Sequence, residues 1–451
     1  MTHESKRYRW KLAAAVGVAL ATVLGGAPIL PETAQAQPAA KAEDDPLANI
    51  VVPADAATQI PLPKIAVLSS TATDMENVNL FSVVRRDIEL SGEFDILTDD
   101  KLPDGPYVGE SIDVKAYEGK GAEAILRVTA RKLSDTKAEL RGQAFVVSQG
   151  DMAVYDKRFE VPIDRVRTES HYVADQLIGA LTGTQGGFFS HLTFVSGTGS
   201  LRRVYRIDSD GFDAKPISPQ DHVAIAPAYG SGGELFWSAS VNKDEYKIFK
   251  ASEPTKAVKT NVKGSVYGLA FNKDYSQIAV SIGVGDTIKV YTGPAFDQLK
   301  EASPIGMAFR PGFTPTGKLA FAGEGKFGQR VYVDGKPISP DGLFASAPTF
   351  CRHPDGIRTV FAVGAGKKFD LVATGETGGQ LVRLTQGMGS NNYPACSPDG
   401  RMIAFFSTKP GGEGLYVMRL GGGSRPKRIS TLMGDSLRWD RLPPSHAVEK
   451  K

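Results

Sequence analysis

The sequence predicts an α+β N-terminal domain followed by an all-β six-bladed β-propeller, and three observations support this. A strand–turn–strand pattern recurs about every 40 residues in the second half of the chain, which is typical of propeller blades. The two ends of this repeat region complement each other, so that they can form one shared closing blade. Helical periodicity is confined to the region before the repeats. With 451 residues the chain is long enough for both domains.

Residues 1–36 are expected to be a signal peptide. A basic segment at 6–11 precedes an apolar segment at 12–24, and Ala34-Gln35-Ala36 supplies a cleavage site, with Ala27 as an earlier alternative. A membrane anchor is the other interpretation, but the apolar run is shorter than the ~20 residues of a spanning helix. We therefore expect an exported, soluble mature protein without membrane insertion after signal cleavage.

Residues 37–63 are rich in Ala, Pro and Asp and are expected to form a flexible N-terminal arm. A short β-prone patch, Ile50-Val51-Val52, interrupts it.

Residues 64–183 are expected to form the α+β domain. Period-two patterns predict strands, and the spacing of apolar residues predicts two helices that end near Gly92 and Gly183. On the first helix, Val78, Phe81, Val84 and Ile88 are expected to face inward. The expected strands are 64–69, 124–132, 138–147 and 153–161, and the expected helices are 77–90 and 164–181.

Residues 184–444 are expected to form the propeller, and 445–451 a tail. The stretch "NNYPACSPDGRMIAFFS" shows the repeat most clearly, because Ser397-Pro398-Asp399-Gly400 is a tight turn between two apolar strands. Residues 191–218 supply three strands without an inner one, and Leu437-Arg438-Trp439 supplies the missing strand. Closure gives six blades and removes exposed sheet edges; seven blades would require an undetected unit. The repeat units begin at Ala226, Gly268, Arg310, Ala347 and Tyr393.

Composition and motifs argue against several functions. The formal net charge is only +3, so there is no electrostatic case for nucleic acid. The sequence has no G-x-S-x-G, H-E-x-x-H or P-loop motif, so we expect no enzyme, cofactor or metal site. Asp208-Ser209-Asp210-Gly211 is better explained as a turn than as a calcium loop, although an ion in the propeller channel stays an open alternative. We expect His171 to pack or cap rather than to catalyse.

The two cysteines, Cys351 and Cys396, are too few for a disulfide framework. Export permits a bridge between them, but their apolar strand contexts favour buried free thiols.

The loops that lead into the innermost strands are the expected binding surface, because function usually lies on loops over a rigid scaffold. They carry aromatic residues and arginine, which are enriched at protein interfaces. The alternative is that some of these aromatic residues pack between blades. The expected surface residues are Ser265, Val266, Tyr267, Phe309, Arg310, Phe344, Ser346, Asn391, Asn392 and Tyr393.

The chain after the signal peptide resembles the TolB family, the periplasmic propellers of the Tol-Pal system. The resemblance rests on several motifs in order, each weak alone. Two departures are clear: only one turn keeps the full Ser-Pro-Asp-Gly, and the tryptophan expected before it is absent. The matching segments are Ile50-Val51-Val52, Pro63–Leu68, Arg86–Phe94, Gly121–Leu126, His171–Gln176 with Leu181-Thr182-Gly183, and Gly187–Phe189 with Leu192–Val195.

The resemblance implies a non-enzymatic periplasmic scaffold, expected to be a monomer. Its propeller face would bind Pal, an outer-membrane lipoprotein, and Ser265, Val266, Tyr267 and Asn392 match that face best by position. Its arm, at Ile50-Val51-Val52, would add a strand to the inner-membrane protein TolA. The implied role is outer-membrane integrity and invagination during cell division. The alternative is a secreted propeller that binds another glycan or lipoprotein.

Overall fold

The computed structural model describes residues 47, 50, 61–241, 245–421 and 425–450. The expected signal peptide therefore lies outside the described residues, as does most of the expected arm, including Val51 and Val52.

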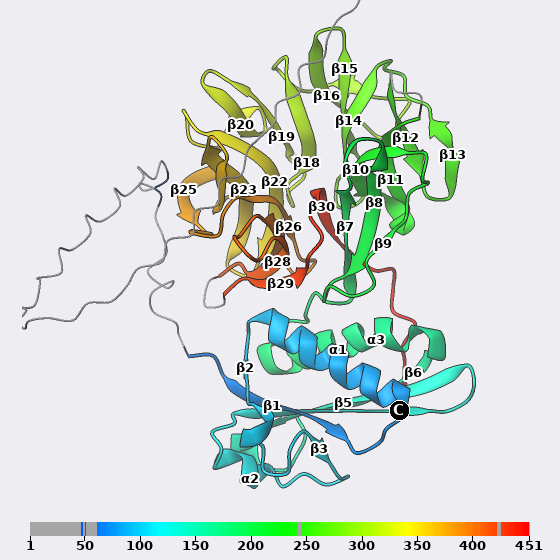
Figure 1. Cartoon of the computed structure of the whole chain (residues 1–451), viewed down its shortest axis with the longest axis vertical. Coiled ribbons are helices and arrows are strands. Elements are labelled where there is room, and N and C mark those ends of the chain that lie inside the picture. Colours follow the sequence, from blue (N-terminus) through cyan, green and yellow to red (C-terminus); the bar gives the residue numbers. More distant parts are fainter. Residues whose placement is uncertain (1–46, 48–49, 51–60, 242–244, 422–424, 451) are drawn as a thin grey trace, which may run out of the picture. The chain divides into compact units, whose positions relative to one another are not determined.

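The α+β domain is built on one seven-stranded sheet. Its strand order is β2-β1-β4-β5-β6-β31, and β3 also pairs with β1. Helices α1 and α3 lie side by side on one face of the sheet (Figure 1). The elements are β1 Lys64–Ser70, α1 Met75–Ser91, β2 Asp95–Ile96, β3 Tyr107–Val108, α2 Val114–Glu118, β4 Ala124–Lys132, β5 Lys137–Val146, β6 Tyr155–Pro162, α3 Val166–Thr182 and β31 Val448–Lys450.

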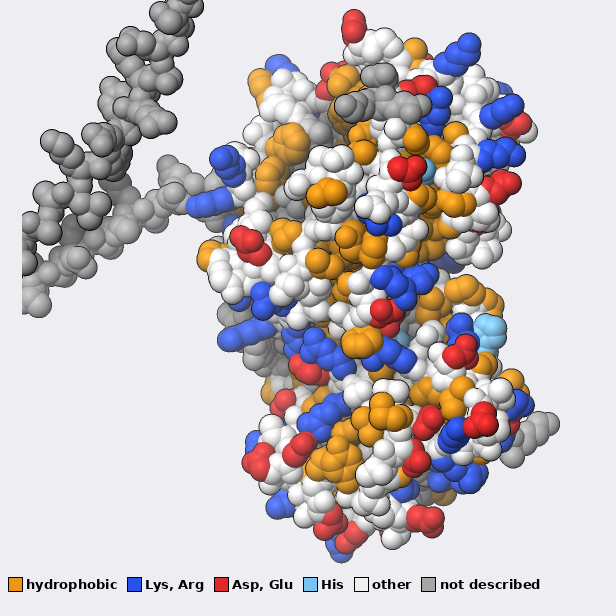
Figure 2. Space-filling view, turned by 45° about the vertical axis from the view of Figure 1, so that its right-hand side comes forward, with side chains coloured by type: hydrophobic (Ala, Val, Ile, Leu, Met, Phe, Trp, Pro, Cys, Tyr) orange, Lys and Arg blue, Asp and Glu red, His pale blue; other side chains and the backbone are white. Residues whose placement is uncertain are grey.

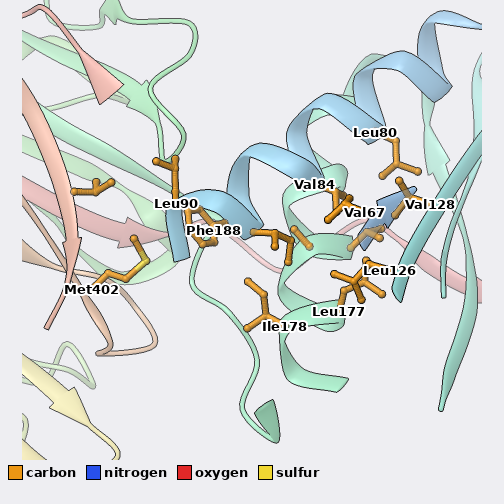
Figure 3. Close-up of a cluster of buried hydrophobic side chains, with 14 of the residues drawn as sticks. Val67, Leu80, Val84, Leu90, Leu126, Val128, Leu177, Ile178, Phe188 and Met402 are labelled. Carbon is orange, nitrogen blue, oxygen red and sulfur yellow. The ribbon is translucent and has the colours of Figure 1, made fainter. Parts of the chain in front are cut away.

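Strand β1 is buried on both faces, and its side chains alternate between two cores. Ile65 and Val67 pack with α1 and α3, whereas Ala66 and Leu68 pack with the cluster that contains α2. The first of these cores continues into the propeller, because Met402 of the last full blade belongs to it (Figure 3). The domain and the propeller thus share apolar packing.

The helix ends agree with the sequence, but one helix face does not. Gly92 and Gly183 follow α1 and α3 in left-handed conformations, with φ of 64° and 79°. The expected inner position Val78 is 48% exposed, so that part of the prediction was wrong. The buried face is instead the i, i+3, i+4, i+8 set that starts at Leu80.

The second region is a six-bladed propeller of four-stranded sheets. The closing blade has the order β30-β7-β8-β9, which confirms that the C-terminal strand completes the first blade. The other five blades are antiparallel meanders in chain order. The closing blade contains β30 Asp435–Arg441, β7 Ser190–Ser196, β8 Arg203–Asp208 and β9 Lys215–Pro216. The others are β10 Val223–Tyr229, β11 Leu235–Ser240, β12 Tyr246–Lys250 and β13 Glu253–Val258; β14 Ser265–Phe271, β15 Ile278–Val284, β16 Thr287–Gly293 and β17 Lys300–Glu301; β18 Ala308–Phe313, β19 Leu319–Gly325, β20 Gly328–Val333 and β21 Lys336–Pro337; β22 Phe344–His353, β23 Gly356–Ala365, β24 Lys368–Gly375 and β25 Gly378–Arg383; and β26 Asn391–Cys396, β27 Met402–Ser407, β28 Gly414–Arg419 and β29 Lys427–Ser430.

The C-terminal segment is more than a tail. After the closing strand the chain returns to the α+β domain, where β31 pairs antiparallel with β6. Glu169, fully buried in α3, accepts a hydrogen bond from the His446 amide at 3.2 Å. Strand addition at this edge therefore ties both ends of the propeller to the same domain.

The expectation of free thiols was wrong. Cys351 and Cys396 form a disulfide, with Cα atoms 5.4 Å apart. They lie on β22 and β26, the inner strands of neighbouring blades, so the bridge crosses between two sheets. Apolar strand contexts indicated burial but carried no information on the distance between the blades.

Candidate partner-binding surface

Each blade has an irregularity at the same place on its inner strand. The antiparallel register shifts once in β10, β14, β18, β22, β26 and β30. In five of these strands a residue with a side chain adopts a left-handed conformation, which is rare and strained for residues other than glycine. These residues are Ala226, Arg310, Ala347, Tyr393 and Ser436, with φ of 50°, 49°, 54°, 55° and 56°.

Gly268 stands at the corresponding shift in β14. A Cβ at this position would lie 2.4 Å from Cδ of Pro311 in the next blade. Only glycine fits this close approach, so the inner strands of these two blades meet here.

The bulged strands surround a cavity of about 560 Å³. All six inner strands contribute to its lining, so the cavity lies at one mouth of the propeller channel. The lining combines aromatic side chains with three arginines and one aspartate. It contains Arg202, Ile225, Ala226, Tyr267, Gly268, Leu269, Phe309, Arg310, Gln329, Phe344, Ser346, Ala347, Pro348, Phe369, Asn392, Tyr393, Pro394, Asp435, Ser436, Leu437 and Arg438.

Most of the expected surface residues are brought together here. Those that line the cavity are Tyr267, Phe309, Arg310, Phe344, Ser346, Asn392 and Tyr393. Tyr267 and Phe344 are 39% and 42% exposed, so neither is buried between blades.

Three expected residues do not line the cavity. Val266 is 3% exposed and packs inside its own blade. Asn391 is fully buried and donates hydrogen bonds to Asp370 Oδ1 at 3.1 Å and Phe369 O at 3.3 Å. Ser265 Oγ accepts a hydrogen bond from the Tyr246 amide at 3.2 Å. Val266 and Asn391 are thus buried within the blades and Ser265 contacts Tyr246 of the preceding blade, which position in the loop alone did not reveal.

Sequence reasoning missed several lining residues, above all Arg202, Ser436 and Arg438. For Arg438 a signal existed, because Leu437 and Trp439 are buried in the closing blade and strand alternation places the residue between them on another side. Arg202 lies in a loop outside the repeat, and no pattern pointed to it.

The charged side chains of the cavity differ in their partners. Arg202 Nη2 forms an ion pair with Asp435 Oδ2 at 2.8 Å. The guanidinium of Arg310 lies over the Tyr393 ring, 4.6 Å from its centre. Arg438 donates hydrogen bonds to the carbonyl oxygens of Pro227 at 3.2 Å and Leu269 at 3.3 Å.

Two described residues of the expected arm, Leu47 and Ile50, lie on the propeller. Leu47 is 3% exposed and belongs to the apolar cluster that contains Phe361 and Val363. Ile50 is partly buried against the same cluster, and its amide donates a hydrogen bond to Leu47 O at 2.9 Å. Of the three arm residues expected to bind a partner, only Ile50 is described.

A group of possible metal ligands lies apart from the cavity. Among the described residues, His171, Asp208 and Asp210 have ligand atoms within 4.8 Å of one another. Arg167 already bonds both aspartates, and His171 Nδ1 lies 2.7 Å from Asp87 Oδ2. Asp208 to Gly211 forms a turn, closed by the Gly211 amide on Asp208 O at 2.9 Å, as the sequence indicates. These charges therefore compensate one another as a structural network.

Charge is mixed on the visible surface. Basic and acidic side chains both occur over the face drawn in Figure 2.

Among the described residues, no helix combines the length and apolar character needed to cross a membrane.

The comparisons with known proteins agree with the resemblance. A family model described as the TolB amino-terminal domain matches residues 48–151. The Tol-Pal system protein TolB of Albidiferax ferrireducens is 25% identical over 197 residues, which cover 44% of this chain and 43% of the relative. The TolB protein of Nitrosomonas europaea is 26% identical over 190 residues, with coverage of 42% and 44%. The aligned region thus spans less than half of these relatives.

Comparison of the folds extends the similarity to TolB over most of the chain. The crystal structure of TolB from Acinetobacter baumannii superimposes with a TM-score of 0.68 at 18% sequence identity, covering 84% of this chain and 96% of that one. The resemblance to TolB is thereby confirmed: residues 48–151 match the TolB amino-terminal domain, and this domain is followed by a propeller of the TolB fold.

Proposed function

We propose that the protein is a non-enzymatic periplasmic scaffold of a Tol-Pal cell-envelope system. Its propeller would bind a Pal-like outer-membrane lipoprotein, and its arm would bind a TolA-like inner-membrane protein. Such a scaffold would link the two membranes, supporting outer-membrane integrity and invagination during division. The observation that carries the proposal is the channel-mouth cavity, in which seven of the ten expected surface residues meet.

The composition of the cavity supports recognition of a protein. Eight of the 21 lining residues are tyrosine, phenylalanine or arginine, and these residue types are enriched at protein interfaces. The bulged inner strands hold them on a rigid scaffold, which lowers the entropy lost on binding.

Calorimetric titration of residues 37–451 with the periplasmic domain of Pal from the same organism tests this proposal. Tyr267→Ala removes an exposed aromatic side chain at the cavity and is expected to weaken binding tenfold or more. Tyr275→Ala is the matched control, because Tyr275 is 44% exposed in the β14–β15 turn and does not line the cavity. Asn392→Ala provides a second test at the cavity.

Two results would contradict the proposal. No binding by the folded protein would favour another glycan or lipoprotein ligand, and equal losses from Tyr267→Ala and Tyr275→Ala would move the interface elsewhere. The arm is tested separately, by comparing binding of a TolA periplasmic domain to residues 37–451 and 61–451. Retained binding by the shorter chain would remove Ile50-Val51-Val52 from the proposal.

A further inference from the structure

Among the described residues, two arginines at the channel mouth have no carboxylate at ion-pair distance. Arg310 and Arg438 both line the 560 Å³ cavity, and within the described part of the chain neither has a carboxylate oxygen at ion-pair distance. The third arginine of the cavity, Arg202, is paired with Asp435. The contrast shows that only part of the positive charge here is compensated.

The two unpaired guanidinium groups are held in place by neutral partners. Arg310 Nη2 donates to Tyr393 Oη at 3.3 Å, and its group stacks over the same ring. Arg438 uses Nε and Nη2 to bond carbonyl oxygens of two neighbouring blades. These contacts fix the orientation of both groups without neutralising them, and each guanidinium has further N–H donors. An arginine fork held in this way is suited to a carboxylate.

Asp440 is the acidic group that raises the pKa of Arg438, and it lies two residues further along β30. Both residues line a second cavity of about 200 Å³, whereas Asp440 is not part of the lining of the larger one. Burial lowers the pKa of Arg438; Asp440 raises it, and Arg310 lowers it again, so the two arginines repel each other. An anion between them would relieve that repulsion.

We propose that Arg310 and Arg438 form a receptor for a carboxylate side chain on an acidic peptide segment of the partner. The surrounding Tyr267, Phe309 and Phe344 would contact apolar side chains that flank this acid. The inference deepens the proposed function and rests on it for the identity of the partner. The carboxylate would bridge two cations that the free protein leaves unpaired, giving both affinity and orientation.

The first test repeats the Pal titration with Arg310→Gln and Arg438→Gln. Each substitution removes one charge and is expected to weaken binding at least tenfold. Arg158→Gln is the matched control, because Arg158 is exposed on β6 of the α+β domain. Raising NaCl from 50 to 500 mM is expected to weaken Pal binding by the unsubstituted protein more than Pal binding by either variant.

The second test uses acetyl-hexaglutamate amide as the probe, with acetyl-hexaglutamine amide as its control. At 50 mM NaCl we expect calorimetry to show that the unsubstituted protein binds hexaglutamate but not hexaglutamine. Both arginine variants are expected to lose the binding signal with hexaglutamate. Because Arg438 also joins two blades, Arg438→Gln can disturb folding, but Arg310→Gln removes only a contact with Tyr393. Circular dichroism spectra confirm which variants are folded.

The outcomes separate the two proposals. If Pal binds and folded Arg310→Gln binds it equally well, the carboxylate receptor is wrong while the proposed function stands. If Pal does not bind, the proposed function fails. The titration with hexaglutamate then still tests whether Arg310 and Arg438 bind a carboxylate. Equal binding of hexaglutamate by the unsubstituted protein and Arg310→Gln would overturn the inference in either case.

Discussion

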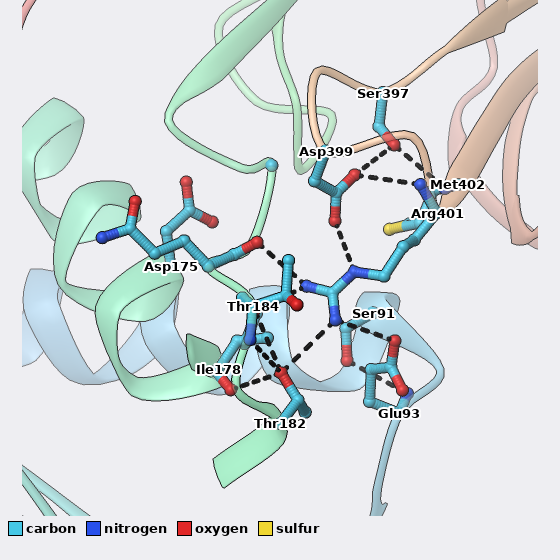
Figure 4. A network of polar contacts seen from close by, with 12 residues as sticks. Ser91, Glu93, Asp175, Ile178, Thr182, Thr184, Ser397, Asp399, Arg401 and Met402 are labelled. Atoms are coloured by element: carbon cyan, nitrogen blue, oxygen red, sulfur yellow. Dashed lines mark hydrogen bonds and ion pairs between the residues drawn. The ribbon is translucent and has the colours of Figure 1, made fainter. Parts of the chain in front are cut away.

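Arg401 is the residue whose loss should most weaken the junction between the α+β domain and the propeller. It follows the Ser-Pro-Asp-Gly turn of the last full blade and is 7% exposed. Its guanidinium bonds Asp399 Oδ2 at 2.9 Å and the carbonyl oxygens of Thr184 and Gln185, each at 3.0 Å (Figure 4). It also lies 3.4 Å from Glu93 Oε1. One side chain thus joins the blade, the α+β domain and the linker.

Arg401→Met keeps the unbranched aliphatic part of the side chain and removes the charged guanidinium. The Asp399 side chain, only 6% exposed, would then be buried without a cation, and the linker carbonyls would lose their donors. Breaking a buried pair costs about 3–5 kcal/mol. Glu93 keeps Arg419 at 2.9 Å, which places the expected loss at the lower end, about 3 kcal/mol.

Guanidinium unfolding followed by two probes measures this loss. The tryptophans of the mature chain, Trp237 and Trp439, lie in the propeller, so their fluorescence reports that region. Far-ultraviolet circular dichroism at the helical band follows α1 and α3. For Arg401→Met we expect a lower midpoint and separated transitions, because the two regions unfold less cooperatively.

Arg86→Met is the control. Arg86 forms an exposed i,i+3 pair with Glu89 at 3.5 Å, which contributes at most about 0.5 kcal/mol. The reasoning is refuted if Arg401→Met stays within about 0.5 kcal/mol of the unsubstituted protein and both probes still report one transition.

Two further predictions concern stability. Replacing Cys351 and Cys396 by Ala should lower the free energy of unfolding by about 4 kcal/mol, because their bridge spans a sequence separation of 45 residues; equal denaturant midpoints for the oxidised protein and the variant would contradict the bridge. Stability should also fall as the pH rises from 7 to 9. Burial raises the pKa of Asp87 to about 6 and that of Asp175 to about 7. Burial opposes the charged form of His171, but Asp87 outweighs it and raises that pKa to about 9. Each group binds its proton more tightly in the folded state, so its contribution is complete at low pH and lost as the pH passes the folded pKa. Urea unfolding across this range checks the sign, and a rise in stability would contradict it.

The sequence predicted the propeller well because its signal is repeated. Each unit repeats a hairpin of two apolar strands at a spacing of about 40 residues, although only one turn keeps the full Ser-Pro-Asp-Gly, and the two incomplete ends match. The four long strands and two long helices of the α+β domain were found from periodicity to within a few residues, as for α3 at Val166–Thr182, whereas the short elements β2, β3 and α2 were not predicted. Sequence patterns were therefore sufficient to predict those elements whose structure is determined by residues close together in the chain.

Apart from the helix face at Val78, the incorrect predictions concern features that depend on contacts between segments distant in the sequence. The Cys351–Cys396 bridge depends on how two neighbouring blades approach each other. Strand β31 pairs with β6 across most of the chain length, and its sequence carries no strong strand pattern of its own. At the cavity, Val266 and Asn391 belong to the correct loops but point away, because the bulges decide which side chains reach the channel.

The two ends of the inner hairpins have different roles, which explains why one turn keeps its full motif. In the last full blade, Asp399 and Arg401 contact the α+β domain and linker, and a Cβ on Gly400 would lie 2.1 Å from Arg352 O. In the related turn at His353-Pro354-Asp355-Gly356, the Asp355 side chain is 77% exposed, and among the described residues it forms an ion pair only with His353 of the same turn. Turn chemistry is therefore most constrained where it joins the domains. At the other end of the blades, the bulged strands hold the cavity side chains on a fixed backbone, so those side chains can vary with the partner while the fold stays the same.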